Sequence, residues 1–361
     1  MRYISLAVLL VLTIPASAAA EQLVEGRRSV VLEGSQSRLV VDLLGGSIVD
    51  FRLTEHGVNP LRWANAGPTD QARSMSHFLC LDRWGLPSEA EKANGMQGHG
   101  EATKVAWEIL EQRTTSARMS ANLPMAGLRV EREIELAASG GWFYVAETVT
   151  NRNKLGRVYN MVQHPTIGPP FLDESVVVDS NAAKGFMQGG AMPNPEEPSV
   201  VWPIALNNGE PVNLRFLSDD HDPNVVSYVI DDEYGWVTAA NAGKGLLIGY
   251  VWKRADYPWL NIWRRAENGK PLARGLEFGS TGLHQPFPIL VKKGKIFGRP
   301  LLDFLDASES KTRSYVGFLA EIPKGYRGVA SANLTGGELN LVERESGAQL
   351  RVAMPPEFAV R

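Results

Sequence analysis

The fold class is indicated first by Arg38-Leu39-Val40-Val41-Asp42-Leu43-Leu44-Gly45-Gly46-Ser47-Ile48-Val49-Asp50-Phe51-Arg52-Leu53, which spans residues 38–53. Two apolar runs rich in valine and leucine flank a Gly-Gly dipeptide, and the second run partly alternates apolar with polar residues. A half-buried strand shows this period of two, and paired glycines are typical of the turn between two strands. The stretch therefore predicts a β-hairpin.

Similar patterns along the chain predict many short strands. Further apolar, partly alternating runs occupy residues 29–32, 128–136, 142–150, 225–230, 245–252 and 315–320, whereas 103–112 fits a strand or a short helix. The 35 glycines and 22 prolines are spread between these runs, and no fixed-period repeat is present. Many strands with frequent turns predict a large antiparallel sandwich. Residues 181–197 are expected to form a long surface loop that could flank a site.

Composition limits the classes of function. The chain has 361 residues, a hydrophobic fraction of 44% and a formal net charge of -3. The apolar content is enough for a large core, and the near-neutral charge argues against a nucleic-acid-binding protein. Length alone permits one large domain or two. No proline-rich or charged hinge divides the chain, so we expect a single domain over residues 21–361.

The N-terminus has the features of a cleaved signal peptide over residues 1–20. Arg2 supplies a positive charge, Leu6 to Ile14 form a short apolar run, and small residues follow up to Ala20. This run is too short for a comfortable membrane span. The sequence therefore predicts an exported protein, periplasmic or secreted, of bacterial type. The single cysteine, Cys80, excludes an intrachain disulfide and is expected to be a small buried hydrophobe.

Two histidines lie in stretches suited to presenting an imidazole. His99 is flanked by glycines in Gln97-Gly98-His99-Gly100-Glu101-Ala102, which permits unusual backbone angles, although an exposed turn would look the same. His164 precedes a proline in Asn160-Met161-Val162-Gln163-His164-Pro165-Thr166-Ile167-Gly168-Pro169-Pro170-Phe171, which predicts an extended residue at a strand end. It could carry protons or serve a structural role by hydrogen-bonding a loop carbonyl.

A carboxylate occurs in an apolar strand, within Gly275-Leu276-Glu277-Phe278-Gly279-Ser280-Thr281-Gly282. Alternation sends Glu277 to the opposite face from Leu276 and Phe278. If that face lines a concave surface, burial would raise the pKa of Glu277 and suit it to general-base catalysis. Otherwise Glu277 is a solvent-facing residue of an alternating strand.

Other residues are candidates for binding a ligand. Residues 256–264 concentrate aromatic rings beside polar groups, an arrangement that suits sugars but also core packing, and they include Asp256 and Trp263. Arg83 could donate bidentate hydrogen bonds to a ligand or pair with Asp82 or another carboxylate. Gln163 adjoins His164. Four histidines could in principle converge on a metal ion: His77, His99, His164 and His284. Their spacing matches no compact ligand motif, so no metal is expected.

In their order along the chain, these motifs resemble the aldose 1-epimerase (galactose mutarotase-like) superfamily. The resemblance rests on ordered groups of residues: Gly45 to Phe51 with Gly57 to Leu61, His99-Gly100-Glu101-Ala102 with Trp107, Thr148 to Asn151 with Gln163-His164-Pro165, and Leu276-Glu277. The chain departs from the family pattern at Glu101, which replaces an aromatic residue, and in the Gly-Pro-Pro-Phe segment after Pro165. Asp222 and Asp256 are both candidates for the family's sugar-binding aspartate.

The resemblance implies an all-β fold, a mostly antiparallel β-supersandwich with few short helices. It also implies that Glu277 takes the proton of the anomeric hydroxyl, that His164 protonates the ring oxygen, and that His99 binds the sugar near that oxygen. The further substrate-binding candidates are Arg83, Gln163, Trp263 and Asp256. The expected partner is a small sugar or an oligosaccharide, with no cofactor. Alternatives are a non-catalytic carbohydrate-binding protein and a polysaccharide lyase or hydrolase on the same fold.

Overall fold

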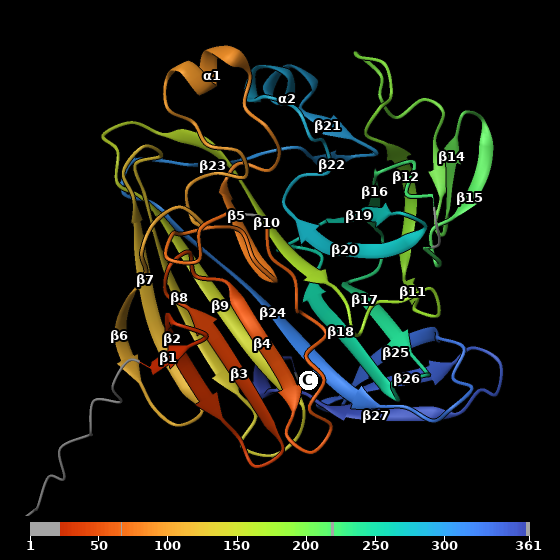
Figure 1. Cartoon of the computed structure of the whole chain (residues 1–361). Helices are drawn as coiled ribbons and strands as arrows, with labels where there is room; N and C mark the ends of the chain where they lie inside the picture. Colours follow the sequence, from red (N-terminus) through yellow and green to blue (C-terminus); the bar gives the residue numbers. More distant parts are fainter. Residues whose placement is uncertain (1–21, 66, 218–219, 359–361) are drawn as a thin grey trace, which may run out of the picture.

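The computed structural model describes residues 22–65, 67–217 and 220–358. Two large β-sheets face each other and form a sandwich (Figure 1). All pairings between the named strands are antiparallel, and α-helix is limited to two short segments in the described residues. The all-β prediction is confirmed. The predicted signal peptide, residues 1–20, lies outside the described residues.

The larger sheet holds most of the residues discussed below. In spatial order it consists of β1 (Gln22–Val24), β2 (Arg27–Glu33), β3 (Ser37–Asp42), β4 (Ile48–Leu53), β5 (His77–Asp82), β10 (Arg157–Ile167), β20 (Lys270–Gly279), β19 (Trp259–Glu267), β16 (Val225–Ile230), β12 (Ala182–Met187) and β13 (Val200–Val201), with β23 (Asp303–Leu305) paired to one end of β10.

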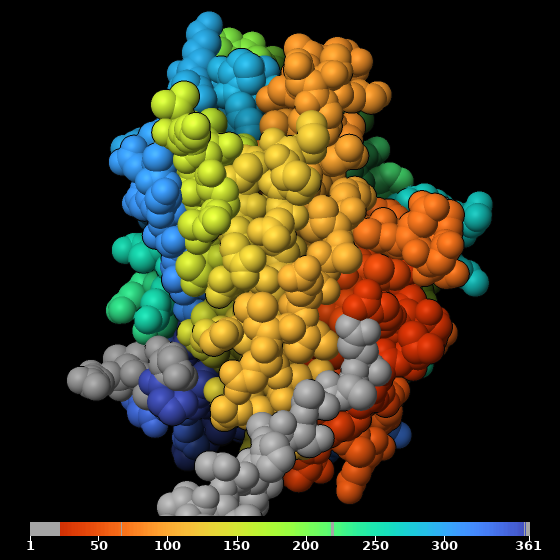
Figure 2. Space-filling view, turned by 90° about the vertical axis from the view of Figure 1, so that its left-hand side faces the viewer, coloured from red at the N-terminus to blue at the C-terminus, as the bar shows by residue number. Residues whose placement is uncertain are grey.

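The smaller sheet covers the inner face of the larger one. In spatial order it consists of β11 (Val177–Ser180), β17 (Tyr234–Asn241), β18 (Leu246–Lys253), β24 (Ser310–Glu321), β9 (Trp142–Asn151), β8 (Leu128–Leu136), β7 (Ser116–Leu123) and β6 (Glu108–Gln112). Strands β6–β9 form a broad continuous face in the space-filling view (Figure 2).

Short elements complete the structure. They are α1 (Glu89–Ala93), α2 (Phe287–Lys293), the hairpins β14 (Ile204–Asn207)–β15 (Glu210–Asn213) and β21 (Lys295–Ile296)–β22 (Arg299–Pro300), the sheet β25 (Val329–Thr335), β26 (Glu338–Glu343) and β27 (Gln349–Ala353), and the 3₁₀ turn Pro356–Phe358. Figure 1 and Figure 2 both show the α1 and α2 segments side by side at one end of the sandwich. No helix among the described residues is long and apolar enough to cross a membrane.

The core lies between the two sheets and follows from the alternation along their strands. Leu276 and Phe278 of β20 and Met161 of β10 point inward and are fully buried in the main hydrophobic cluster. Side chains between these positions, including Glu277, point to the outer face of the larger sheet. The predicted separation of Glu277 from its apolar neighbours is therefore present.

The strands expected at 29–32, 38–53, 128–136, 142–150, 225–230, 245–252 and 315–320 are all present. Residues 103–112 resolve as the strand β6 over 108–112. The prediction of a loop over 181–197 is wrong in its first part, because Ala182–Met187 form β12, which pairs with β16. His164 also lies inside β10, which continues to Ile167, rather than at the strand end.

Candidate active site

Strand register brings a histidine and a carboxylate together. In the pairing of β10 with β20, Gln163 lies opposite Phe278 and Thr166 opposite Gly275, which places His164 opposite Glu277. The two side chains leave the same face of neighbouring strands, and His164 Nε2 lies 3.1 Å from Glu277 Oε1. Directly opposed residues of an antiparallel pair have Cβ atoms close enough for such contact. The sheet itself therefore sets this distance.

Glu277 is buried, with a second polar partner. Its Oε2 accepts a hydrogen bond from the indole Nε1 of Trp84 at 2.7 Å, and its residue exposure is 1%. Gly275 and Gly279 flank it on the same face of β20. A Cβ at Gly275 would lie 2.8 Å from Glu277 Oε1 and 3.1 Å from the Cβ of Trp263. The glycine therefore leaves the space that the carboxylate occupies.

His164 is held on one face of its ring and at Nδ1. The Phe78 ring stacks on it with centroids 4.1 Å apart, because the two residues are opposite each other in the β5–β10 pairing. Thr166 Oγ1 lies 3.0 Å from His164 Nδ1, and its hydroxyl can donate to the His164 carbonyl oxygen at 3.4 Å. In that arrangement Nδ1 carries a proton, and Nε2 is the nitrogen that exchanges protons with Glu277.

Burial shifts both members of this pair toward their uncharged forms. It raises the pKa of Glu277 well above its ordinary value, against the opposing effect of the Trp84 N–H. It lowers the pKa of His164 well below its ordinary value, with a smaller contribution from the nearby His99. Burial therefore favours one proton shared between the carboxyl and Nε2, with no net charge on the pair.

Two further histidines border the same space. The backbone of His99 has φ of 61°, and a Cβ on the following Gly100 would lie 2.0 Å from the Leu81 carbonyl oxygen, so the sequence must have glycine there. His284 packs edge-on against Trp84 at 4.7 Å. Burial lowers the pKa of His99 to about 3 and that of His284 to about 4. Both rings are neutral at pH 7 and can donate or accept hydrogen bonds.

These groups line a pocket of about 200 Å³ on the outer face of the larger sheet. Its walls are largely aromatic, and Trp63 meets Trp263 edge-on at 5.6 Å. Among the described lining residues, Glu277 is the one carboxylate. The full lining is Trp63, Asn65, Phe78, Trp84, His99, His164, Asn224, Val225, Trp263, Glu277 and His284. The structure thus brings together four of the seven predicted site residues: Glu277, His164, His99 and Trp263.

Arg83, a predicted substrate-binding residue, lies outside this pocket. Its guanidinium is fully buried, pairs with Glu91 at 2.9 Å and donates to the Gln285 carbonyl oxygen at 3.1 Å. It joins the α1 segment to the segment that precedes α2. The alternative of a carboxylate pairing is the one found, with Glu91 as the partner rather than Asp82.

Gln163 and Asp256 also lie outside the pocket. Gln163 alternates with His164 and therefore points into the core, where its Nε2 donates to Glu147 Oε2 at 2.5 Å and to the Tyr257 hydroxyl at 3.1 Å. Asp256 lies in the turn before β19, where its carboxylate accepts from the Ser314 N–H at 3.2 Å. Asp222, the other candidate for a sugar-binding aspartate, does not line the pocket either.

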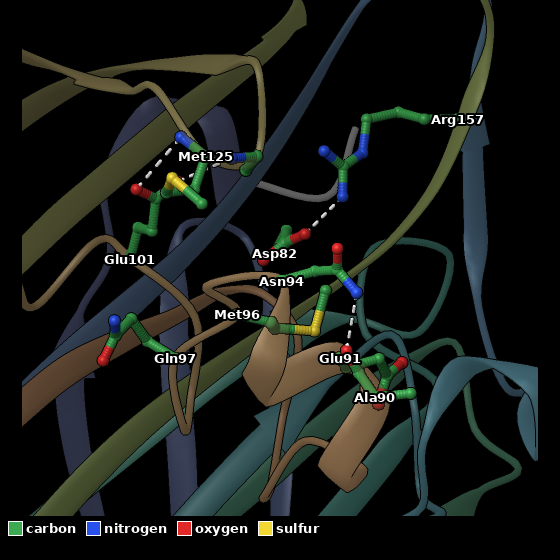
Figure 3. Close-up of a pocket in the computed structure, with 10 residues that line it drawn as sticks. Asp82, Ala90, Glu91, Asn94, Met96, Gln97, Glu101, Met125 and Arg157 are labelled. Atoms are coloured by element: carbon green, nitrogen blue, oxygen red, sulfur yellow. Dashed lines mark hydrogen bonds and ion pairs between the residues drawn. The ribbon is translucent and has the colours of Figure 1, made fainter.

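A separate pocket of about 280 Å³ lies beside α1 and shares no lining residue with the first (Figure 3). The three described carboxylates on its wall all have partners within the protein, and Glu91 is the one that pairs with Arg83. Asp82 forms an ion pair with Arg157, and Glu101 accepts the backbone N–H groups of Met125 and Ala126. Glu101, which departs from the family pattern, therefore fixes the 125–126 turn.

Several contacts in the site could not be predicted from the sequence. Trp84 follows Arg83 directly, but its contact with Glu277 spans 193 positions and depends on the fold of the intervening loops. The sequence offers His284 only as a candidate metal ligand, whereas in the structure it lines the pocket. His77 points to the core face of β5, where it contacts Gln163. Within the described ranges, no three His, Cys, Asp or Glu side chains are grouped so as to hold a metal ion.

Comparison with known proteins supports the fold. No protein-family profile and no curated protein sequence matches the chain. Solved structures do match. A galactose mutarotase-like protein from Clostridium acetobutylicum has 13% identity and a TM-score of 0.61 over 84% of this chain and 98% of that one. A galactose mutarotase related enzyme from Lactobacillus acidophilus has 11% identity and a TM-score of 0.61 over 82% and 98%.

The chain has the galactose mutarotase-like fold. A further galactose mutarotase-like protein, from Lactobacillus casei ATCC 334, has 14% identity and a TM-score of 0.59 over 81% of this chain and 100% of that one. The mutarotase-like architecture expected from the ordered motifs is confirmed. Chemistry has to be argued from the site.

Proposed function

We propose that the protein interconverts the anomers of a reducing sugar, with Glu277 as general base and His164 as general acid. The observation that carries this proposal is the 3.1 Å contact between Glu277 Oε1 and His164 Nε2 inside an aromatic pocket. Anomer exchange needs one base and one acid beside a single carbon atom, which bears both the anomeric hydroxyl and the ring oxygen.

The proton balance of this reaction fits the pair. The carboxylate of Glu277 takes the proton from the anomeric hydroxyl, while His164 Nε2–H gives a proton to the ring oxygen as the C1–O5 bond breaks. Rotation about C1–C2 exposes the other face of the aldehyde, and the two transfers run backward during closure. The pair ends with the single proton with which it began, so each turnover resets the site without solvent.

The remaining walls suit a neutral polyol. His99 and His284 are neutral and can hydrogen-bond hydroxyl groups, and the faces of Trp63 and Trp263 can stack on C–H surfaces. The volume of about 200 Å³ is small beside the ~300–1,000 Å³ of sites for drug-sized ligands. This favours a single sugar ring over a polymer in the pocket.

Exchange spectroscopy by NMR on freshly dissolved aldoses tests the proposal. The wild-type protein should accelerate anomer exchange, and Glu277→Gln should reduce the acceleration by about 10³-fold or more, because the base is lost. Glu131→Gln on β8 is the matched control, since this carboxylate pairs with Arg129 on the smaller sheet. Equal rates for wild type and Glu277→Gln would refute the mechanism.

A binding function without catalysis is the second candidate, and the three tryptophans of the pocket favour it. In that case Trp263→Ala weakens sugar binding more than Glu277→Gln does, and no anomer exchange is catalysed. A glycosidase with paired carboxylates is less well supported, because Glu277 is the one carboxylate among the described lining residues.

Export is part of the same proposal. A cleaved signal peptide over residues 1–20 would deliver the protein to the periplasm or the medium, where free sugars enter the cell. Fractionation of expressing bacteria and N-terminal sequencing test it. A mature N-terminus near Glu21 in the periplasmic fraction is expected, and a cytoplasmic protein that retains Met1 would contradict it.

A further inference from the structure

A third, larger pocket adjoins the aromatic pocket that contains Glu277 and His164, which is called the sugar pocket below. It has a volume of about 430 Å³ and shares Trp63 with the first pocket. Trp63 thus stands between the two spaces, stacked near Phe78 at 6.2 Å and edge-on to Trp263 at 5.6 Å. The wall of the larger pocket comes partly from β2, β3 and β4, which contribute mostly polar side chains: Arg27, Ser29, Asp42, Val49, Asp50 and Arg52.

Part of the charge in this larger pocket is already neutralised. The guanidinium of Arg27 pairs with the buried Asp42 at 2.8 Å. Arg52 Nε lies 3.3 Å from Asp50 Oδ2, and burial raises the pKa of Asp50, which weakens it as a counter-charge. The remaining carboxylate of the wall is the exposed Glu25.

Two arginines of the wall have no carboxylate partner in the described part of the chain. Arg73 donates from Nη1 to the carbonyl oxygens of Asn65 and Gly67, at 3.3 and 2.8 Å, while its Nε is buried without a partner. Arg62, next to Trp63, is exposed, and none of the hydrogen bonds and ion pairs found within the described ranges involves its side chain. The larger pocket therefore offers cationic donors beside the sugar pocket.

We propose that this larger pocket binds an anionic group of the saccharide. The proposal rests on the proposed function, which determines which end of the saccharide lies in the sugar pocket. Only a unit with a free anomeric carbon can change anomer, so the reducing-end ring occupies the sugar pocket. The group beyond Trp63 is then attached elsewhere on that ring. Guanidinium groups match carboxylate, sulfate and phosphate oxygens in pairs of hydrogen bonds, whereas neutral hydroxyls need no such charge. The substrate class is an acidic saccharide.

Calorimetric titration of the full chain tests this inference with matched pairs of probes. Cellobiouronic acid, which carries a glucuronate on the non-reducing side, is compared with cellobiose, and glucose 6-phosphate with glucose. At least one acidic member should bind about tenfold or more tightly than its neutral partner, with an advantage that shrinks as salt rises. The first pair reports an acidic neighbouring unit, and the second an ester on the same ring.

Variants identify the residues responsible. Arg62→Ala and Arg73→Gln should each lower affinity for the preferred acid toward that of its neutral partner, whereas Arg118→Ala on β7, away from both pockets, should not. Equal affinity for acidic and neutral probes, or a preference that survives the double variant, would overturn the inference. Anomer exchange of neutral aldoses is measured separately. Its absence together with a retained acid preference would refute the proposed catalysis and leave the anion site standing.

Discussion

His164 Nε2 and Glu277 Oε1 lie 3.1 Å apart on neighbouring strands, so the acid and the base are hydrogen-bonded to each other in the free protein. They behave as one titrating unit that holds a single proton at neutral pH. The form active in anomer exchange, carboxylate with imidazolium, has the same proton count as the neutral pair. Substrate binding therefore redistributes a proton without requiring one from solvent.

We predict a broad pH plateau for anomer exchange. Adding a second proton would put a net positive charge in the buried pair, and removing the last proton would leave a net negative charge. Burial opposes both changes, as the lowered pKa of His164 and the raised pKa of Glu277 indicate. The acid limb of kcat/KM should fall below pH 6.5, and the alkaline limb above neutrality. An acid limb centred at 6.5 would show instead that His164 titrates as a solvated ring.

Replacing Trp84 with phenylalanine should slow the reaction while keeping the fold. The change removes the 2.7 Å N–H···O bond to Glu277 and with it the effect that lowers the pKa of the carboxyl. We expect kcat to fall about 10- to 100-fold and the alkaline limb to move to higher pH. Trp142→Phe on β9, where the ring packs against the C-terminal strands, is the control. An unchanged pH profile would assign Trp84 a packing role only.

Gly275→Ala should damage catalysis more than stability. The new Cβ would lie 2.8 Å from Glu277 Oε1, so the carboxylate must move away from His164. A displacement of this kind can cost about 10²-fold in kcat. Gly189→Ala provides the comparison, because its Cβ would meet nothing within 4 Å. Normal kcat in Gly275→Ala would mean that the acid–base distance tolerates such a shift.

Gln163→Leu should reduce stability and leave the KM for sugar unchanged. The amide bridges Glu147, Tyr257 and His77 inside the core, and its loss leaves buried polar groups with fewer partners. The expected cost is about 1–3 kcal/mol in the free energy of unfolding, measured by urea denaturation. A raised KM at normal stability would instead support the original prediction that Gln163 touches substrate.

Stability should decline in acid through the buried histidines. Burial lowers the pKa of His77 to about 3 in the folded protein, whereas the unfolded chain takes up the proton near 6.5. Below pH 6.5 the unfolded state therefore binds more protons, and the free energy of unfolding falls until about pH 3, by up to about 1.4 kcal/mol per pH unit for this group. The pH series of urea unfolding should be less steep in His77→Gln. An equal slope would show that His77 is protonated in both states.

The sequence was sufficient for the strands and for the face on which Glu277 lies. Both follow from local alternation, since Leu276 and Phe278 must point to the core. The sequence was not sufficient to predict contacts between residues that lie far apart in the chain. From the sequence alone, Arg83 could pair with any carboxylate. The position of α1 in the fold is what brings Glu91 to it.

The alternation of side chains along β10 explains why His164 lines the pocket and Gln163 does not. Gln163 and His164 are adjacent in sequence, so one must point to the core and the other to the outer face. The two side chains therefore cannot both face the pocket. Asp256 is near aromatic residues in the sequence and is a candidate for the sugar-binding aspartate that the resemblance implies, but it lies in the turn before β19. Trp263 lies within that strand, on the pocket side.

The pocket combines two kinds of support that can change independently. His164 and Glu277 project from the centre of a sheet, where hydrogen-bonded neighbours fix their spacing at the ~4.7–4.9 Å separation of strands. Trp63, Trp84, His99 and His284 lie on connecting segments outside the strands. Substitutions or insertions in these segments can reshape which saccharide fits while the proton-transfer distance stays constant. Divergence of specificity on this scaffold therefore does not require the chemistry to be rebuilt.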